Sequence, residues 1–310
     1  MDRMAGVLGA VAVAAAALAW PAAAQASAVL TAAVGNNMNH VPSFVGVEKG
    51  IFLKHGIDLK LKVLNTGQEM SKALQAGEVQ IIGSAYSNFP LAVERGMAAR
   101  GVVGLMGDRS GRHWDQSVTI WTRRGTGITR LEDLVGRKLG TAVGGTADEY
   151  LGVVLRKKGL DRSQVQVLNV PPGNSLSVLQ SGSVDAVACW EPFASQIEAR
   201  VPDAVLLSRG GGHIGYFINM AVRSDLIDRQ PDLVERYVLG MAEATWYTRT
   251  HPDEAAEIST RWIPGLDVPV ARRALANMVF DARITSHTVA AWEENVRVLM
   301  EQKKLRCAAR

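Results

Sequence analysis

Apolar and polar positions follow one order of segments through the first third of the chain. An apolar run at 28–34 predicts a buried strand, and an amphipathic stretch at 42–54 predicts a helix. Residues 58–64 alternate apolar with polar side chains, which indicates a second strand. A helix at 69–75 and a third strand at 79–83 complete a β-α-β-α-β unit.

The second third of the chain repeats this unit. LQAGEV at 74–79 returns as LQSGSV at 179–184, and VLN at 63–65 returns at 167–169. The repeat predicts a strand at 137–143, a helix at 147–158, a strand at 164–169, a helix at 175–180 and a strand at 184–189. We therefore predict a duplicated supersecondary unit.

Short strands that alternate with amphipathic helices predict an α/β fold with helices on both faces of parallel sheets. Further strands at 116–124 and 216–222 are expected where the chain crosses between the units, so the two crossings would form a hinge. The prediction is two lobes, each a mainly parallel sheet covered by helices. Lobe 1 is expected to hold residues 27–117 and 222–310, and lobe 2 residues 118–221.

The last part of the chain is predicted to be helical. Helices are expected to start at Pro231, Pro252, Pro269 and Ser286. Their tryptophans, Trp246, Trp262 and Trp292, are predicted to anchor the core.

A ligand cleft is expected between the lobes. Ligands of parallel sheets bind beyond the carboxyl ends of the strands, and two units that face each other enclose such a space. The loops after the first and third strands of each unit would line it: 35–43, 84–88, 143–146 and 190–192.

The N-terminus predicts export. Arg3 precedes an apolar run at 6–20, and small residues then offer cleavage near Ala24 or Ala26. Residues 1–26 are therefore predicted to be a cleaved signal peptide, and the protein to be periplasmic; an uncleaved N-terminal anchor is the alternative. No later stretch approaches the ~20 apolar residues of a membrane span.

Composition is that of a globular protein. The 310 residues are 47% hydrophobic and 21% charged, which excludes disordered and collagen-like classes. A net charge of +4, with only short basic clusters, argues against nucleic acid as a partner. Cys189 and Cys307 lie far apart in the sequence, and no disulfide between them is predicted. The six histidines lack ligand spacing, so no metal and no cofactor are expected.

In lobe 1, two polar segments are candidate ligand contacts. The first follows the first strand and consists of Asn36, Asn37, Asn39 and His40. Asparagine both donates and accepts, so this cluster suits an amide, an amine or a heterocycle edge, while an ordinary turn is the alternative. The second segment contains Ser84, Ala85 and Tyr86, between a strand and a helix, where free N–H groups would favour an anion. Simple capping by Ser84 is the alternative.

In lobe 2, Gly144, Gly145 and Thr146 are predicted to offer a second helix N-terminus to an anion, with helix capping by Thr146 as the alternative. Trp190 could cover a flat or aliphatic ligand. Glu191 prefers a cationic or N–H donor partner, or else caps the helix that follows.

Three more candidate residues lie near the crossings. Ser110 and Arg112 belong to a polar loop at the cleft edge, where Arg112 could clamp an oxyanion with two N–H bonds; an ordinary surface position is the alternative. Tyr216 would face the pocket from the hinge or simply pack there.

Several segments resemble one known family. They are VEKGIF at 47–52, HGID at 55–58, ALQAG at 73–77, LEDLVGRKLG at 131–140 and VDAVACWEPF at 184–193. In this order they resemble the periplasmic binding proteins of ABC importers for nitrate, sulfonates, taurine and thiamine-pyrimidine precursors. The resemblance covers nearly the whole chain after residue 26. It implies a monomeric type II binding protein that delivers one small molecule to membrane permease subunits.

The sequence leaves three functions open: a non-catalytic solute receptor for import, which it favours, a receptor that presents its ligand to a membrane sensor, and an enzyme similar to the thiamine-pyrimidine synthases. The export signal and the absence of a Cys-rich loop weigh against the enzyme. The ligand is expected to be a small sulfonate, taurine or nitrate-type anion, with a pyrimidine or other heterocycle as the alternative.

Overall fold

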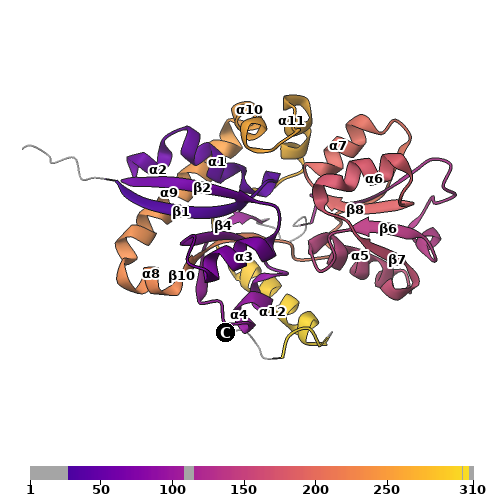
Figure 1. Cartoon of the computed structure of the whole chain (residues 1–310), viewed down its shortest axis with the longest axis horizontal. Helices are drawn as coiled ribbons and strands as arrows, with labels where there is room; N and C mark the ends of the chain where they lie inside the picture. Colours follow the sequence, from indigo (N-terminus) through magenta and orange to yellow (C-terminus); the bar gives the residue numbers. More distant parts are fainter. Residues whose placement is uncertain (1–26, 108–114, 302, 307–310) are drawn as a thin grey trace, which may run out of the picture.

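The computed structural model describes residues 27–107, 115–301 and 303–306. The predicted signal peptide, the candidates Ser110 and Arg112, and Cys307 lie outside these residues. Figure 1 shows two lobes side by side, each built on one sheet. Of the helices described, none is both long enough and apolar enough to cross a membrane.

The sheet of lobe 1 has the strand order β2-β1-β3-β10-β4. Its strands are β1 (Ala28–Gly35), β2 (Ile57–Leu64), β3 (Ile81–Ala85), β4 (Ala99–Met106) and β10 (Ile218–Arg223). β1 runs parallel to β2 and β3, whereas β10 is antiparallel to both of its neighbours.

The sheet of lobe 2 has the equivalent order, β7-β6-β8-β5-β9. Its strands are β5 (Val118–Arg123), β6 (Lys138–Thr141), β7 (Gln166–Asn169), β8 (Ala186–Trp190) and β9 (Ala204–Arg209). Here β5 is the antiparallel strand, in the position that β10 has in lobe 1. The predicted fold, two lobes of mainly parallel sheet, is confirmed.

Helices cover both sheets. Lobe 1 carries α1 (Val41–Glu48), α2 (Ile51–Lys54), α3 (Gly67–Gln75) and α4 (Phe89–Glu94); lobe 2 carries α5 (Thr146–Lys157), α6 (Ser175–Ser181) and α7 (Phe193–Arg200). The chain ends in α8 (Ser224–Arg229), α9 (Pro231–Thr250), α10 (Pro252–Trp262), α11 (Val268–Ala276) and α12 (Ser286–Glu301). The single helix expected at 42–54 is two helices, because Gly50 adopts a left-handed conformation with φ of 65°.

The second crossing differs from its predicted boundary. β10 pairs with β3 and β4, so the chain is already part of lobe 1 at Ile218, earlier than the expected change at 221/222. Each crossing strand thus completes the sheet that it enters. β4 and β9 were not expected from the apolar pattern.

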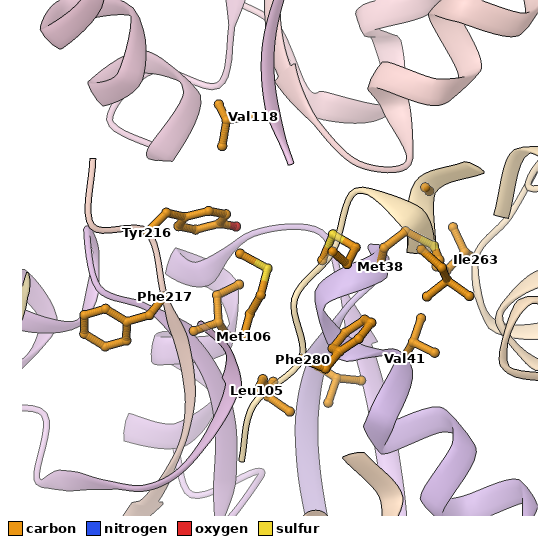
Figure 2. Packing of buried hydrophobic residues seen from close by; sticks show 14 of the residues in the cluster. Met38, Val41, Leu105, Met106, Val118, Tyr216, Phe217, Ile263 and Phe280 are labelled. Atoms are coloured by element: carbon orange, nitrogen blue, oxygen red, sulfur yellow. The ribbon is translucent and has the colours of Figure 1, made fainter. Parts of the chain in front are cut away.

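Packed aromatic rings join the helices of lobe 1 to one another. Phe44 of α1 stacks on Trp262 of α10 at 5.2 Å between ring centroids, and Trp292 of α12 packs edge-on against Phe89 at 5.5 Å. Figure 2 shows the buried apolar side chains where the lobes meet, with Tyr216 between Met106 of lobe 1 and Val118 of lobe 2. Trp246, in contrast, is 60% exposed, so its prediction as a core anchor was wrong.

Candidate functional site

A cleft of about 540 Å³ lies between the lobes. Lobe 1 lines it with the loops after β1, β2 and β3, and lobe 2 with the loops after β6, β7 and β8. Of the predicted site residues, the structure brings eight to its wall: Asn37, Asn39, His40, Ala85, Gly145, Thr146, Trp190 and Tyr216. That these residues contact ligand stays a prediction.

The loops after the second strands also line the cleft, which the sequence analysis missed. Asn65 follows β2 and Asn169 ends β7, and both face the cleft. Asn65 accepts a hydrogen bond from Asn36 Nδ2 at 3.0 Å, and Asn169 accepts one from Val143 N at 3.1 Å. Each asparagine therefore fastens the loop that follows the first strand of its own lobe. The repeated VLN segment was the signal that could have identified them.

The polar residues that follow β1 make different contacts. Asn36 is not part of the cleft wall. Asn37 Oδ1 accepts a hydrogen bond from Asn39 N at 3.1 Å, so Asn37 caps the short 3-10 helix at 38–40. Asn37 also lines the cleft. Asn39 Nδ2 donates to the hydroxyl of Tyr216 at 2.9 Å, which ties the loop after β1 to the returning crossing.

His40 is an uncharged imidazole at the cleft wall. It is 2% exposed, and burial lowers its pKa to about 3. The ring fits because residues 35 and 83 are glycines: a Cβ on Gly83 would lie 1.9 Å from His40 Cε1. Nδ1 is shielded and has no hydrogen-bond partner.

The segment after β3 is buried more deeply than expected. Ser84 lies within β3 and is 1% exposed; it neither caps a helix nor lines the cleft. Tyr86 packs between Tyr216 and Phe217, at 6.0 and 5.6 Å between ring centroids. Only Ala85 and Asn88 of this segment face the cleft.

The two backbone N–H groups just before α5 already have acceptors. The Gly144 N–H donates to Asp148 Oδ2 at 2.9 Å, and the Gly145 N–H donates to Ala142 O at 3.0 Å. The capping residue is Gly145, so the alternative of capping by Thr146 is not observed. Thr146 Oγ1 instead bonds Ser87 Oγ across the lobes at 3.2 Å. This terminus offers an anion fewer free N–H groups than the sequence indicated.

Trp190 offers an unsatisfied donor. It ends β8, lines the cleft and packs near Gly145, and its Nε1 is buried with no hydrogen-bond partner. A buried indole N–H normally finds an acceptor, so a ligand acceptor placed here would complete the site.

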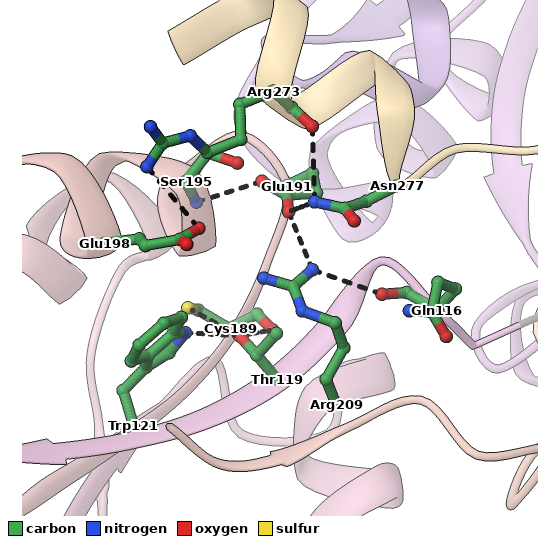
Figure 3. Close-up of polar contacts among 10 residues, drawn as sticks. All are labelled: Gln116, Thr119, Trp121, Cys189, Glu191, Ser195, Glu198, Arg209, Arg273 and Asn277. Carbon is green, nitrogen blue, oxygen red and sulfur yellow. Dashed lines mark hydrogen bonds and ion pairs between the residues drawn. The ribbon is translucent and has the colours of Figure 1, made fainter. Parts of the chain in front are cut away.

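Glu191 belongs to the lobe junction and not to the cleft wall. It is fully buried, and its carboxylate accepts from Arg209 Nη1 at 3.0 Å, Asn277 Nδ2 at 2.9 Å and Ser195 N at 3.0 Å (Figure 3). The bond to Ser195 caps α7, the alternative expected from the sequence. Asn277 follows α11 of lobe 1, so Glu191 also joins the two lobes.

The cleft wall carries little charge. Among its described residues, only Glu69 and Lys72 of α3 are charged side chains. The remaining polar groups are amides, hydroxyls, an indole and a neutral imidazole. In the part of the chain that the structure describes, no three His, Cys, Asp or Glu side chains gather as a metal site requires. The described wall therefore offers mainly hydrogen-bonding groups and few charges.

Comparisons with known proteins agree with this architecture. A putative binding protein of Brucella abortus is 25% identical over 224 residues, 71% of this chain and 66% of its own length, just under two thirds. A putative aliphatic sulfonates-binding protein of Bacillus subtilis is 28% identical over 253 residues, 79% of this chain and 73% of the relative. The alkanesulfonate-binding protein SsuA of Xanthomonas axonopodis, solved with MOPS, shares the fold with a TM-score of 0.79 at 18% identity, over 91% of this chain and 96% of that one. The model of the family described as NMT1/THI5 like matches residues 37–255, and the chain belongs to that family.

Proposed function

We propose that this protein is a periplasmic, non-catalytic solute receptor that hands a small molecule to the permease of an ABC importer. The observation that carries the proposal is the cleft, whose wall is shared by two lobes joined by two crossings. A ligand that bonds both walls stabilises the closed arrangement by its differential contacts. The sulfonate-binding relatives and the predicted signal peptide support the transport role.

For the ligand, we propose a small organic sulfonate or a similar anion. A sulfonate oxygen would accept from the unpartnered Trp190 Nε1, and Lys72, which shares α3 with Glu69, is the cationic side chain of the described wall. The cleft volume, about 540 Å³, leaves room for an organic group beyond a bare anion such as nitrate.

A neutral heterocycle is the second candidate because one observation favours it. Neutral His40, with Nδ1 free, and the asparagines of both lobes match the donor and acceptor edge of a pyrimidine.

Thermal unfolding of the chain from Ser27 to Arg310 tests the proposal. The ligand-free protein is scanned against taurine, alkanesulfonates, nitrate, aromatic carboxylates and pyrimidine precursors. A ligand at ~100 times its Kd adds about 2.7 kcal/mol, a shift of a few degrees. Trp190→Phe should reduce the ligand-induced shift, measured from the unfolding temperature of the same variant without ligand, and Trp246→Phe, on the exposed surface, is its control. If no compound shifts the transition, the ligand assignment is wrong.

A further inference from the structure

A second cavity, of about 390 Å³, lies between the lobes beside the cleft. Lobe 1 contributes Ser87, Leu91 and the end of α12, and lobe 2 contributes the first turns of α5. Glu149 of α5 lies in its wall. None of the functions described above uses this side chain.

Glu149 faces Tyr86 across the two lobes. The two side chains interact, yet neither Glu149 Oε2 nor the Tyr86 hydroxyl completes a hydrogen bond, and both atoms are shielded from solvent. Glu149 is half-buried as a residue, but its Oε2 is shielded and has no donor. An ionised carboxylate in that position is costly, and protonation removes the charge and turns the carboxyl into a donor. Separating the lobes would return Glu149 to water and remove that cost.

The charges around Glu149 do not remove its preference for a proton. From its own helix, Asp148 opposes ionisation, although Asp148 itself is bound by Arg162 and by the Gly144 N–H. The Tyr86 hydroxyl favours ionisation, as does Lys304, which follows α12. Burial outweighs both and raises the pKa of Glu149 to about 7.

Other charged groups lie further off. Arg156, Asp161 and Arg162 line the same cavity without a resolved effect on Glu149, and Asp115 and Tyr216 act on Tyr86.

We propose that lobe closure is coupled to proton uptake by Glu149, so that acid favours the closed, ligand-holding form. This inference rests on the proposed receptor function. In the closed form the carboxyl holds a proton that it releases when the lobes separate and water reaches it. The closed form therefore binds more protons than the open form at pH values between about 4.5 and 7. Ligand affinity should rise as the pH falls through this window, by up to tenfold per pH unit, and should be flat above about pH 8.

The test compares wild type, Glu149→Gln and a control, Glu235→Gln, which removes an exposed carboxylate of α9. Calorimetry with pentane-1-sulfonate between pH 5.5 and 8.5 measures affinity, and the charge of this probe is constant over that range. Small-angle X-ray scattering of the ligand-free proteins measures lobe separation without any ligand. Thermal unfolding at pH 8.5 checks that each variant is folded.

We expect wild type and Glu235→Gln to gain affinity and compactness as the pH falls. Glu149→Gln should be independent of pH and, at pH 8.5, should bind as wild type does at low pH. Tyr86→Phe removes a hydroxyl that stabilises the ionised Glu149 carboxylate. In this variant the rise in ligand affinity with falling pH should therefore begin at a higher pH than in wild type.

Parallel pH curves for wild type and Glu149→Gln, or curves that are flat in both, would overturn the proposal. If pentane-1-sulfonate fails to bind at every pH, only the sulfonate assignment is wrong. The scattering curves of the ligand-free proteins then show whether protonation of Glu149 favours lobe closure. Neither result depends on the other.

Discussion

Ser87 Oγ of lobe 1 and Thr146 Oγ1 of lobe 2 lie 3.2 Å apart and share a buried hydrogen bond. The bond stands between the ligand cleft, which Thr146 lines, and the second cavity, which Ser87 lines. The lobes are also joined by Glu191 with Asn277 and by Arg200 of α7 with Asp267 before α11, the latter at 2.6 Å. These contacts between the lobes stabilise their closed arrangement, and a ligand in the cleft would stabilise it further.

Ser87→Ala should weaken ligand binding. Loss of one buried hydrogen bond made only in the closed form costs about 1 kcal/mol, roughly a fivefold rise in Kd. Calorimetry with the ligand identified by the thermal scan measures it, and Ser177→Ala on the exposed face of α6 is the matched control. Equal Kd values for the two variants would show that the bond contributes nothing to closure.

Glu191→Ala should destabilise the protein by about 3–5 kcal/mol, because it leaves the Arg209 guanidinium, only 14% exposed, without its buried partner. Urea unfolding measures this loss. Adding Arg209→Met should restore part of the stability. Asp228→Ala breaks the exposed pair with Arg100 and should cost below about 1 kcal/mol. A Glu191 variant as stable as the Asp228 variant would contradict the importance of this junction.

His40 should make the protein less stable in acid. Its pKa in the folded protein is about 3, below the usual 6.5, so the folded form binds fewer protons. The stability is therefore complete above pH 6.5 and declines toward pH 3, by at most about 1.4 kcal/mol per pH unit. Urea unfolding of Glu149→Gln with and without His40→Gln isolates the effect, since Glu149 titrates with the opposite sign. Parallel stability curves would refute it.

Gly83→Ala should destabilise the lobe 1 side of the cleft. The added Cβ would lie 1.9 Å from His40 Cε1, in a buried site that cannot expand freely, so we expect a loss of about 1–3 kcal/mol. Gly173→Ala, where a Cβ meets nothing within 4 Å, is the control. Thermal unfolding compares the two, and equal transitions would show that the His40 ring moves aside without cost.

Much of the site's location could be predicted from the sequence. Parallel strands direct their following loops to one edge of the sheet, so the strands assigned from apolar periodicity already placed Asn37, Asn39, Thr146 and Trp190 near the cleft. Asn65 and Asn169 were missed although they occupy equivalent positions in the repeat, because only loops after the first and third strands were considered.

The roles of individual side chains were harder to predict. Capping of α7 by Glu191 through Ser195 N was a local expectation, but the other two partners, Arg209 and Asn277, lie 18 and 86 residues away, so the sequence did not identify Glu191 as a buried junction carboxylate. Similarly, the sequence predicted free backbone N–H groups at the start of α5. In the structure the fold brings Asp148 Oδ2 to the Gly144 N–H and Ala142 O to the Gly145 N–H.

The sequence by itself determined the duplicated unit, its α/β character and the edge of each sheet that lines the cleft, since these depend on local periodicity and turn residues. Only the tertiary structure decided that β10 completes the lobe 1 sheet, that Glu191 is buried and that Glu149 faces Tyr86. These depend on which surfaces meet after two lobes have folded. The burial of a side chain and the pairing of a strand depend on the surfaces that pack against it, which no single segment of the sequence specifies.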